Sequence, residues 1–443
     1  MLGVTTITIR EWLLRALLAL LVAYVLFFSI GYTLEYRVEL KAVQWLTATR
    51  IALLLLACGY LWLVRSEIRR LIDPFALCII AVIVTGAASG LFGEKYWFTY
   101  LRHLFQYSFL LAFYLLGREV ALRPIPHAAI KALSGTILVG YAIATVLYAA
   151  TPGLQSGSYS FQPNLALLPI ASGLTSGNWM ISLLGSVIVV VGNKRAVYIG
   201  LSIMVAVYIA VMLERKWDRT VLMRFVVVGL TAPIIGAAFG FAVHALTSSM
   251  ASFMSAPTVP TVVDRFTLQQ TFNRGAQIDA AQEAKIDPVV RLTSARSAEV
   301  RVVWEMVKRS PAEALFGQGF GSQFTVEYIS PNNYEPVRFD RDQADLAPVQ
   351  IALTSGVPLA LIFTAMLCGM VLMAFIRIGS ASGVDFALAL FSIGLLLDTL
   401  LGLHATNPVC WLALGIVSVR LLPDFTLECA VSSLKLRWLQ QNA

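Results

Sequence analysis

Three basic residues, Arg296, Arg301 and Lys308, lie within one predicted amphipathic helix and are the first candidates for chemistry in this sequence. The helix is indicated by apolar residues at the i, i+3, i+4, i+7 spacing, namely Val300, Val303, Trp304 and Val307. At about 100° per residue, Arg301 and Lys308 flank that apolar stripe, and Arg296 lies on its edge one turn earlier. The helix therefore holds guanidinium groups close to whatever its apolar face covers.

Signals at both ends bound this helix. Ser294 can cap its start and Pro311 can end it. A glycine-rich segment follows, with Gly317, Gly319 and Gly321 at alternate positions. Glycine lets the backbone approach a ligand closely, so the amides of this turn are a second candidate site.

The rest of the chain is too apolar for an ordinary globular protein. Of its 443 residues, 58% are hydrophobic and 13% are charged, and apolar runs of about 20 residues recur. This composition predicts an all-α polytopic membrane protein. The net charge of +8 is assigned to topology rather than to nucleic acid, because Arg and Lys concentrate in short connections. The five cysteines match no metal-ligand spacing, and we expect no metal and no cofactor.

About twelve membrane-spanning helices are predicted, with boundaries loose by several residues. Nine lie in residues 1–246, at about 11–32, 43–64, 73–93, 97–118, 127–150, 161–176, 178–193, 196–213 and 224–246. Residues 247–346 form one large loop that we expect to be mainly helical. Residues 347–443 hold three more spans, at about 347–377, 384–404 and 408–424, and a cytoplasmic tail.

The sixth span decides the orientation of the chain. Residues 161–176 are short and interrupted by Pro163 and Pro169, so hydropathy alone leaves them open between a span and a re-entrant helix. If they cross, the basic connections fall on the same side as both termini; if they do not, the two halves of the molecule disagree in charge bias. We therefore expect both termini in the cytoplasm and the large loop outside.

Six ionisable residues fall in the outer third of the predicted bundle or at its outer surface: Arg50, Arg102, His103, Arg195, Asp398 and His404. Charges inside a membrane are costly and usually face a bundle interior or a wet cavity. The simplest way to satisfy them together is a polar cavity that opens outward beneath the loop. The alternatives are that Arg50 and Arg102 extend outward to the membrane surface, and that Asp398 pairs with a neighbouring span for packing.

The order of these features resembles the O-antigen ligase and polysaccharide polymerase superfamily, the Wzy and WaaL type of GT-C-like membrane glycosyltransferase. Arg301 is followed by fifteen residues and then Gly317, which resembles the Arg-x15-Gly pattern of the family's large periplasmic loop. Trp304 and residues 310–321 resemble the family's Trp and its Pro-Leu-hydrophobic-Gly-x-Gly segment. The turn that contains Arg195 resembles the family's Ser-Arg-Gly turn.

The resemblance implies transfer of a glycan from an undecaprenyl-diphosphate carrier to a sugar hydroxyl at the periplasmic face of the bacterial inner membrane. The expected partners are the carrier-linked oligosaccharide, the lipid bilayer and a chain-length regulator protein, with no nucleic acid. Arg195 and Arg301, with Arg296 as a third candidate, would bind the diphosphate, because the planar fork of arginine bonds phosphate oxygens bidentately. Fixed cations would stabilise the charge that grows on the leaving group.

One departure from the family shifts the expected activity. Where the ligases open the helix after the loop with a His-Asn pair, this chain has Asp345 and Leu346, which favours a polymerase of O-antigen, capsule or exopolysaccharide over an O-antigen ligase. The base for the acceptor hydroxyl would be Asp345, by position, or His404, by its place at the outer end of a span. Asp345 could instead cap the following helix, and His404 could bond a backbone carbonyl.

Five further residues are expected to line the substrate site: Arg50, Arg102, His103, Gly317 and Asp398. The alternative from another class is a lipid-linked oligosaccharide transporter or flippase, for which a polar cavity in a bundle of spans would be equally natural. Transporters of this size often show two matching halves. Here the single large loop makes the two halves of the chain unequal, and no internal repeat is evident in the sequence. We therefore favour the enzyme.

Overall fold

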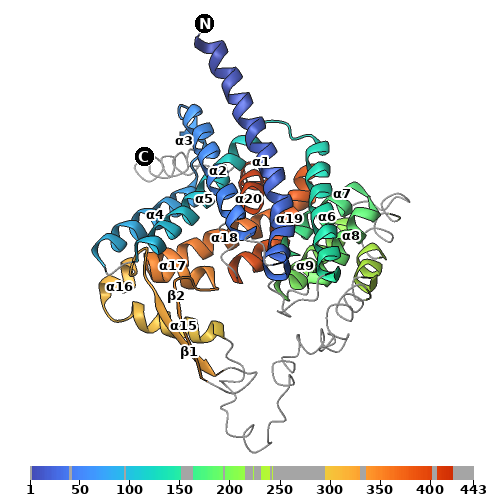
Figure 1. Ribbon diagram of the computed structural model, residues 1–443. Helices are drawn as coiled ribbons and strands as arrows, with labels where there is room; N and C mark the ends of the chain where they lie inside the picture. Colours follow the sequence, from blue (N-terminus) through green and yellow to red (C-terminus); the bar gives the residue numbers. More distant parts are fainter. Residues whose placement is uncertain are drawn as a thin grey trace, which may run out of the picture.

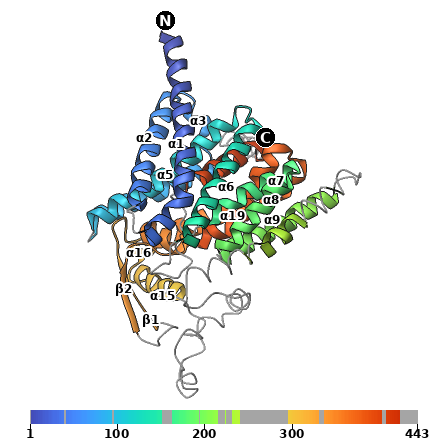
Figure 2. The ribbon, with the colours of Figure 1, turned by 45° about the vertical axis from the view of Figure 1, so that its right-hand side comes forward.

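The computed structural model describes residues 2–38, 42–93, 96–150, 163–192, 195–214, 223, 231–239, 242, 295–329, 336–401 and 407–422. Within these residues the chain is a bundle of helices with a small polar layer packed against one end (Figure 1). The start of α1 projects from the end of the bundle that lies away from this layer (Figures 1 and 2). We call the polar layer the loop module; it consists of α15, α16, β1 and β2.

The bundle is built from two parts of the chain. The first part contains α1 (Leu2–Val38), α2 (Ala42–Leu63), α3 (Ile68–Leu71), α4 (Pro74–Phe92), α5 (Trp97–Ala121), α6 (His127–Ala150), the 3₁₀ turn η2 (Pro163–Ala166), α7 (Leu167–Ser176), α8 (Trp179–Gly192) and α9 (Arg195–Glu214). The second contains α17 (Ala347–Ser355), α18 (Val357–Arg377), η5 (Ile378–Ser380), α19 (Gly383–Leu401) and α20 (Pro408–Arg420). The loop module joins them with α15 (Ala295–Val307), α16 (Pro311–Phe316), β1 (Phe324–Ile329) and β2 (Pro336–Arg341).

Seven of the described helices are long and apolar enough to cross a membrane: Ile9–Gly31, Gln44–Leu63, Pro74–Phe92, His127–Leu147, Ala196–Glu214, Val357–Ser380 and Gly383–Leu400. This supports the prediction of a helical polytopic membrane protein, and the number twelve stays a prediction. The sixth predicted span is a 3₁₀ turn and a ten-residue helix that ends at Gly177. Ten residues rise about 15 Å, half of a bilayer core. The ninth, 224–246, lies mostly outside the described residues.

The tenth predicted span, 347–377, is two helices rather than one. α17 ends and α18 begins at Gly356, whose φ of 95° only glycine adopts without strain. A Cβ at this position would lie 2.1 Å from the carbonyl oxygen of Leu315. The break therefore lets the loop module approach the backbone of the bundle.

The loop module differs from the mainly helical loop that the sequence predicts. β1 and β2 form an antiparallel hairpin in which Phe324 pairs with Arg341 and Ile329 pairs with Pro336. The predicted helix is present, but it ends at Val307, and Pro311 begins α16 instead of ending α15.

The buried face of α15 is also rotated from the predicted stripe. Val303 and Val307 are buried, whereas Val300 and Trp304 are 39% and 54% exposed. The buried face includes Ala298 and Met306 and belongs to one apolar cluster with Phe324 and Val326 of β1. The hairpin, which the sequence analysis missed, sets which side of the helix is covered.

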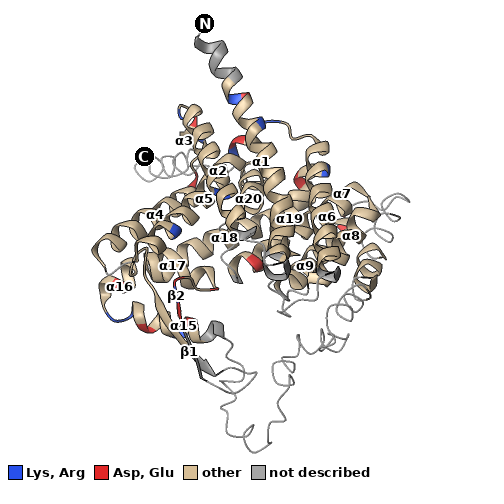
Figure 3. Ribbon diagram, in the orientation of Figure 1, with Lys and Arg blue, Asp and Glu red and all other residues tan. Residues whose placement is uncertain are grey.

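A buried ion pair holds the far end of the bundle. Asp73 caps α4 by accepting a hydrogen bond from the amide of Ala76, 2.7 Å away, and pairs with Arg118 of α5 at 2.6 Å. Tyr114 donates to Asp73 at 2.6 Å, and Arg118 donates to Ser418 of α20 at 2.9 Å. In Figure 3 the described helices of the bundle are mostly tan, so charged residues are sparse along them.

Candidate functional site

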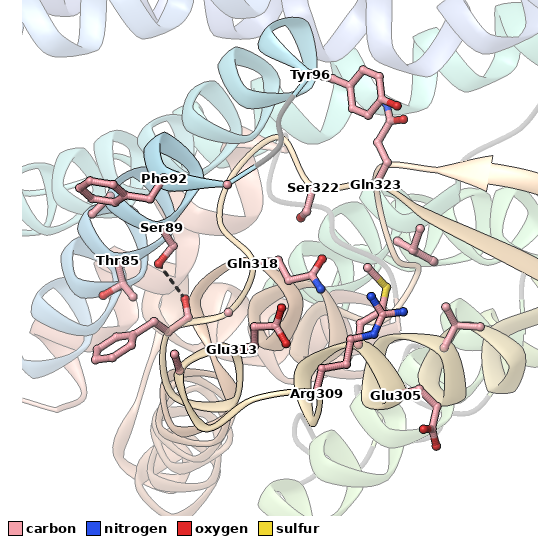
Figure 4. A pocket seen from close by; sticks show the side chains of 18 of the residues that line it. Thr85, Ser89, Phe92, Tyr96, Glu305, Arg309, Glu313, Gln318, Ser322 and Gln323 are labelled. Carbon is pink, nitrogen blue, oxygen red and sulfur yellow. Dashed lines mark hydrogen bonds between the residues drawn. The ribbon is translucent and has the colours of Figure 1, made fainter.

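A groove of about 1730 Å³ lies between α4 and the loop module. One wall comes from the end of α4, with Val84, Ala88 and Phe92 at helical spacing. Phe316 of α16 lies beside Ser89 of α4, whose hydroxyl donates to its carbonyl at 3.1 Å (Figure 4). This side of the groove is therefore largely apolar.

The opposite wall is polar and comes from one face of α15 and the start of α16. Arg301, Glu305 and Arg309 follow one another at intervals of four residues, which places them on one side of the helix and its final turn. Glu305 pairs with Lys308 at 2.6 Å. Within the described part of the chain, Arg301 and Arg309 have no ion-pair partner, so both guanidinium groups are available to an anion in the groove.

The floor of the groove is the glycine-rich turn, which is clamped between bundle helices. Gly317, Gly319 and Gly321 have φ of 71°, 88° and 90°. A Cβ on Gly319 would lie 1.9 Å from the amide nitrogen of Gly90, so the turn needs glycine to fit against α4.

The amides of Gln318, Phe320 and Gly321 bond to protein rather than remaining free for a ligand. Gln318 donates to Leu353 at 2.7 Å, and Phe320 donates to Gly86 at 2.7 Å. The backbone of the turn therefore positions the groove, while the side chain of Gln318 lines it.

His103 connects the turn to the rest of the loop module. It is fully buried, and its Nε2 lies 2.8 Å from the carbonyl of Asp342, while the amide of Gly321 donates to its Nδ1 at 3.4 Å. A carbonyl only accepts hydrogen bonds, so we assign the proton to Nε2 and the acceptor role to Nδ1. Both nitrogens are thus used by the backbone of the loop.

Two ion-pair sets fix the segment that follows β2. Arg102 of α5 pairs with Asp342 at 2.6 Å. Arg341 forms an ion pair with the buried Glu299 of α15 and pairs with Asp345 at 3.2 Å. The N-cap residue of α17 is Leu346, the residue after Asp345. Asp345 is therefore held beside Arg341 and does not line the groove.

Some of the predicted site residues line the groove, others hold the loop module against α5, and two lie elsewhere in the bundle. Arg301 and Gly317 line the groove, and Arg102 and His103 hold the loop module against α5. Arg50 donates to Tyr24 of α1 at 3.3 Å, and Asp398 is buried in α19; neither lines the groove.

Three further predicted residues are described only in part or not at all. Arg195 begins α9 and Arg296 lies in the first turn of α15, but their side chains are outside the described residues, as is all of His404. Their roles stay predictions.

Arg309, Glu313 and Gln318 are among the polar residues of the groove that sequence reasoning missed. Arg309 could have been found by extending the spacing from Arg301 by two intervals of four. Glu313 follows Ser310 by three residues, the spacing of a capping box, and Ser310 does cap α16 with a 3.1 Å bond to the amide of Glu313. Gln318 carries no such signal, because its place depends on the clamped turn.

Comparison with known families matches residues 180–364 to the family described as O-Antigen ligase. The matched region includes α15, α16 and the glycine-rich turn, while α4, the apolar wall, lies outside it. No curated protein and no solved structure matches the chain. The family match supports the O-antigen ligase and polymerase superfamily, whose members are membrane glycosyltransferase-like enzymes, and the seven apolar helices agree with a multi-pass membrane protein.

Proposed function

We propose, from the match of residues 180–364 to the O-antigen ligase family, that this chain is a polysaccharide polymerase. It would transfer a glycan from an undecaprenyl-diphosphate-linked donor to a sugar hydroxyl of a lipid-linked repeat unit. The reaction would take place at the periplasmic face of the bacterial inner membrane, in the groove between α4 and the loop module, without a metal.

The observation that carries this proposal is the pairing of a largely apolar wall with a polar wall that holds two arginines, neither of which has an ion-pair partner among the described residues. Val84, Ala88 and Phe92 face the groove from a helix that is apolar enough to lie in a membrane. Arg301 and Arg309 face it from the loop module. A ligand that suits both walls has a hydrocarbon part joined to an anionic head, which describes a polyprenyl diphosphate.

The arginines would act on the leaving group. As the glycosidic bond to the diphosphate breaks, negative charge grows on the phosphate oxygens, and preorganised cations stabilise that charge more than they stabilise the ground state. Arginine suits this role because it stays charged and bonds two oxygens at once. Arg195 and Arg296 remain proposed members of this set.

Polymerisation by purified protein, measured with lipid-linked repeat units as both donor and acceptor, tests the proposal. Arg301→Ala and Arg309→Ala should each lower the transfer rate by about 100-fold or more, the size seen when one oxyanion donor is removed. Lys at either position should rescue poorly, because the bidentate geometry is lost. Lys308→Ala is the matched control, since Lys308 contacts Glu305 and does not line the groove. Full activity in both alanine variants would contradict the proposal.

The choice of acceptor separates the alternatives. A ligase would use a finished glycan donor and a different acceptor, such as lipid A-core, and would not extend repeat units. A flippase would move the lipid-linked donor across a vesicle membrane without forming a glycosidic bond. Asp345 in place of the histidine of the ligases is the observation that favours polymerisation.

A further inference from the structure

Three carboxylates line the groove, and the structure distinguishes Glu313 from the other two. Glu305 pairs with Lys308 at 2.6 Å, and Asp340 accepts a hydrogen bond from Thr325 at 2.6 Å. Oε2 of Glu313 is buried and has no hydrogen-bond partner among the described residues. An unpartnered carboxylate oxygen in a buried position is costly, and such groups cluster at functional sites.

The capping of α16 does not account for this carboxylate. The amide of Glu313 donates to Ser310, which satisfies the helix start. In a full capping box the side chain of the glutamate would return to the amide of Ser310, but no such bond is made here. The side chain instead projects into the hollow that Gln318 and Arg309 also enter (Figure 4).

We propose that Glu313 is the base that accepts the proton of the acceptor hydroxyl. This inference rests on the proposed function and names a residue for the step that function requires. The acceptor oxygen forms a bond to the anomeric carbon of the donor sugar while the bond from that carbon to the diphosphate oxygen breaks. The diphosphate leaves with the electron pair, and the hydroxyl proton passes to the Glu313 carboxylate, which later releases it to water.

The position of Glu313 is compatible with a carboxylate that accepts the proton while the arginines bind the leaving diphosphate. Arg301 and Arg309 line the same groove as Glu313, so the carboxylate and the cations can contact one bound substrate. Asp345 is engaged by Arg341, which is itself tied to Glu299, and is absent from the groove lining. Glu313 is therefore proposed in place of Asp345, while His404 lies outside the described residues and stays a prediction.

The test compares Glu313→Gln with Glu67→Gln, a carboxylate that pairs with Arg10 and does not line the groove. Donor binding and transfer are measured separately, and the transfer rate is followed across pH. Glu313→Gln should bind the lipid-linked donor within about 3-fold of the unaltered protein and transfer about 100-fold more slowly or worse. It should also lose the fall in rate at acid pH that protonation of the base causes. Glu67→Gln should keep both the rate and the pH profile.

Two results would overturn the inference while leaving the proposed function in place. One is a Glu313→Gln variant with near-normal rate and pH profile while Arg301→Ala and Arg309→Ala are inactive. The other is a loss of donor binding in Glu313→Gln that equals its loss of transfer, because the residue would then bind rather than accept a proton. Normal transfer in the arginine variants would instead overturn the proposed function.

Glu313→Asp is a second variant, which separates a loss of the base from a loss of folding. The shorter side chain withdraws the carboxylate but keeps its chemistry, so the rate should fall by about 10-fold or more while the acid limb remains. A Glu313→Asp variant as fast as the unaltered protein at every pH would count against a positioned base.

Discussion

The rings of Phe320 and Tyr107 stack in parallel, with centroids 5.5 Å apart and planes inclined by 1°. Phe320 belongs to the glycine-rich turn and Tyr107 to α5, so this contact joins the loop module to the bundle. Space for the ring exists because Gly86 of α4 lacks a side chain: a Cβ there would lie 2.3 Å from the ring. The groove is therefore positioned by one aromatic residue inserted between two helices.

Phe320→Ala should detach the loop module. Removing a fully buried Phe costs about 3–5 kcal/mol, and this ring is 0% exposed. We expect a lower thermal unfolding temperature in detergent and faster proteolysis of the loop module. Phe98→Ala is the control, since Phe98 is 80% exposed and should change neither measurement. Equal behaviour of the two variants would show that the insertion does not hold the module.

Gly319→Ala should be more damaging than its small size suggests. The left-handed φ of 88° disfavours any side chain, and the new Cβ would overlap the backbone of Gly90. Because the atoms that the Cβ would meet belong to the backbone of Ser89 and Gly90, no side chain can move to relieve the overlap. We expect loss of stable protein or of transfer activity, measured by thermal unfolding and polymerisation. Gly369→Ala, with nothing within 4 Å of the added carbon, should be neutral or stabilising.

The sequence predicted the parts of the fold that are set by residues close together in the chain. The apolar helices and the polar loop follow from composition, and the helix around Arg301 follows from its spacing. The face that this helix buries does not, because the hairpin covers it and the alternation in residues 324–329 was not read as a strand. Residues such as Val300 and Trp304 satisfied the pattern and are nevertheless exposed.

The candidate site was predicted less completely, for the same reason. Arg301 and Gly317 were found because a linear motif contains them. The apolar wall on α4 lies more than 200 residues away along the chain from α15, so no local pattern links them. Arg102 and His103 contact Asp342 and the loop backbone, and their place in the substrate site stays a prediction.

Arg118→Met should be strongly destabilising because it leaves Asp73 charged and unpaired. The two side chains are 1% and 0% exposed, and removing one partner of a buried pair costs about 3–5 kcal/mol. Adding Asp73→Ser, which removes the second charge but keeps a helix-capping oxygen, should recover part of that loss. Thermal unfolding of the single and double variants measures the difference.

The control for this buried ion pair is the exposed ion pair between Lys308 and Glu305. Lys308 and Glu305 are 50% and 55% exposed, so Lys308→Met should change stability little. If Arg118→Met were as mild as Lys308→Met, the buried pair would not anchor α4 to α5. If the double variant were less stable than the single one, the cost would not come from an unpaired charge.

The orientation of the bundle is tested by cysteine labelling. Ala312, in α16 of the loop module, and Ser66, in the turn before α3, are both exposed and belong to opposite ends of the bundle. Each is replaced by cysteine in a background from which the five native cysteines have been removed.

If the loop module faces the periplasm, an impermeant maleimide should label the cysteine at 312 in intact cells and the one at 66 only after the inner membrane is opened. The expectation follows from the basic residues Arg65, Arg70 and Arg123, which gather at the end of α3 and α5 and predict a cytoplasmic side. Labelling of 66 but not 312 in intact cells would place the groove in the cytoplasm, where a periplasmic polymerase could not work.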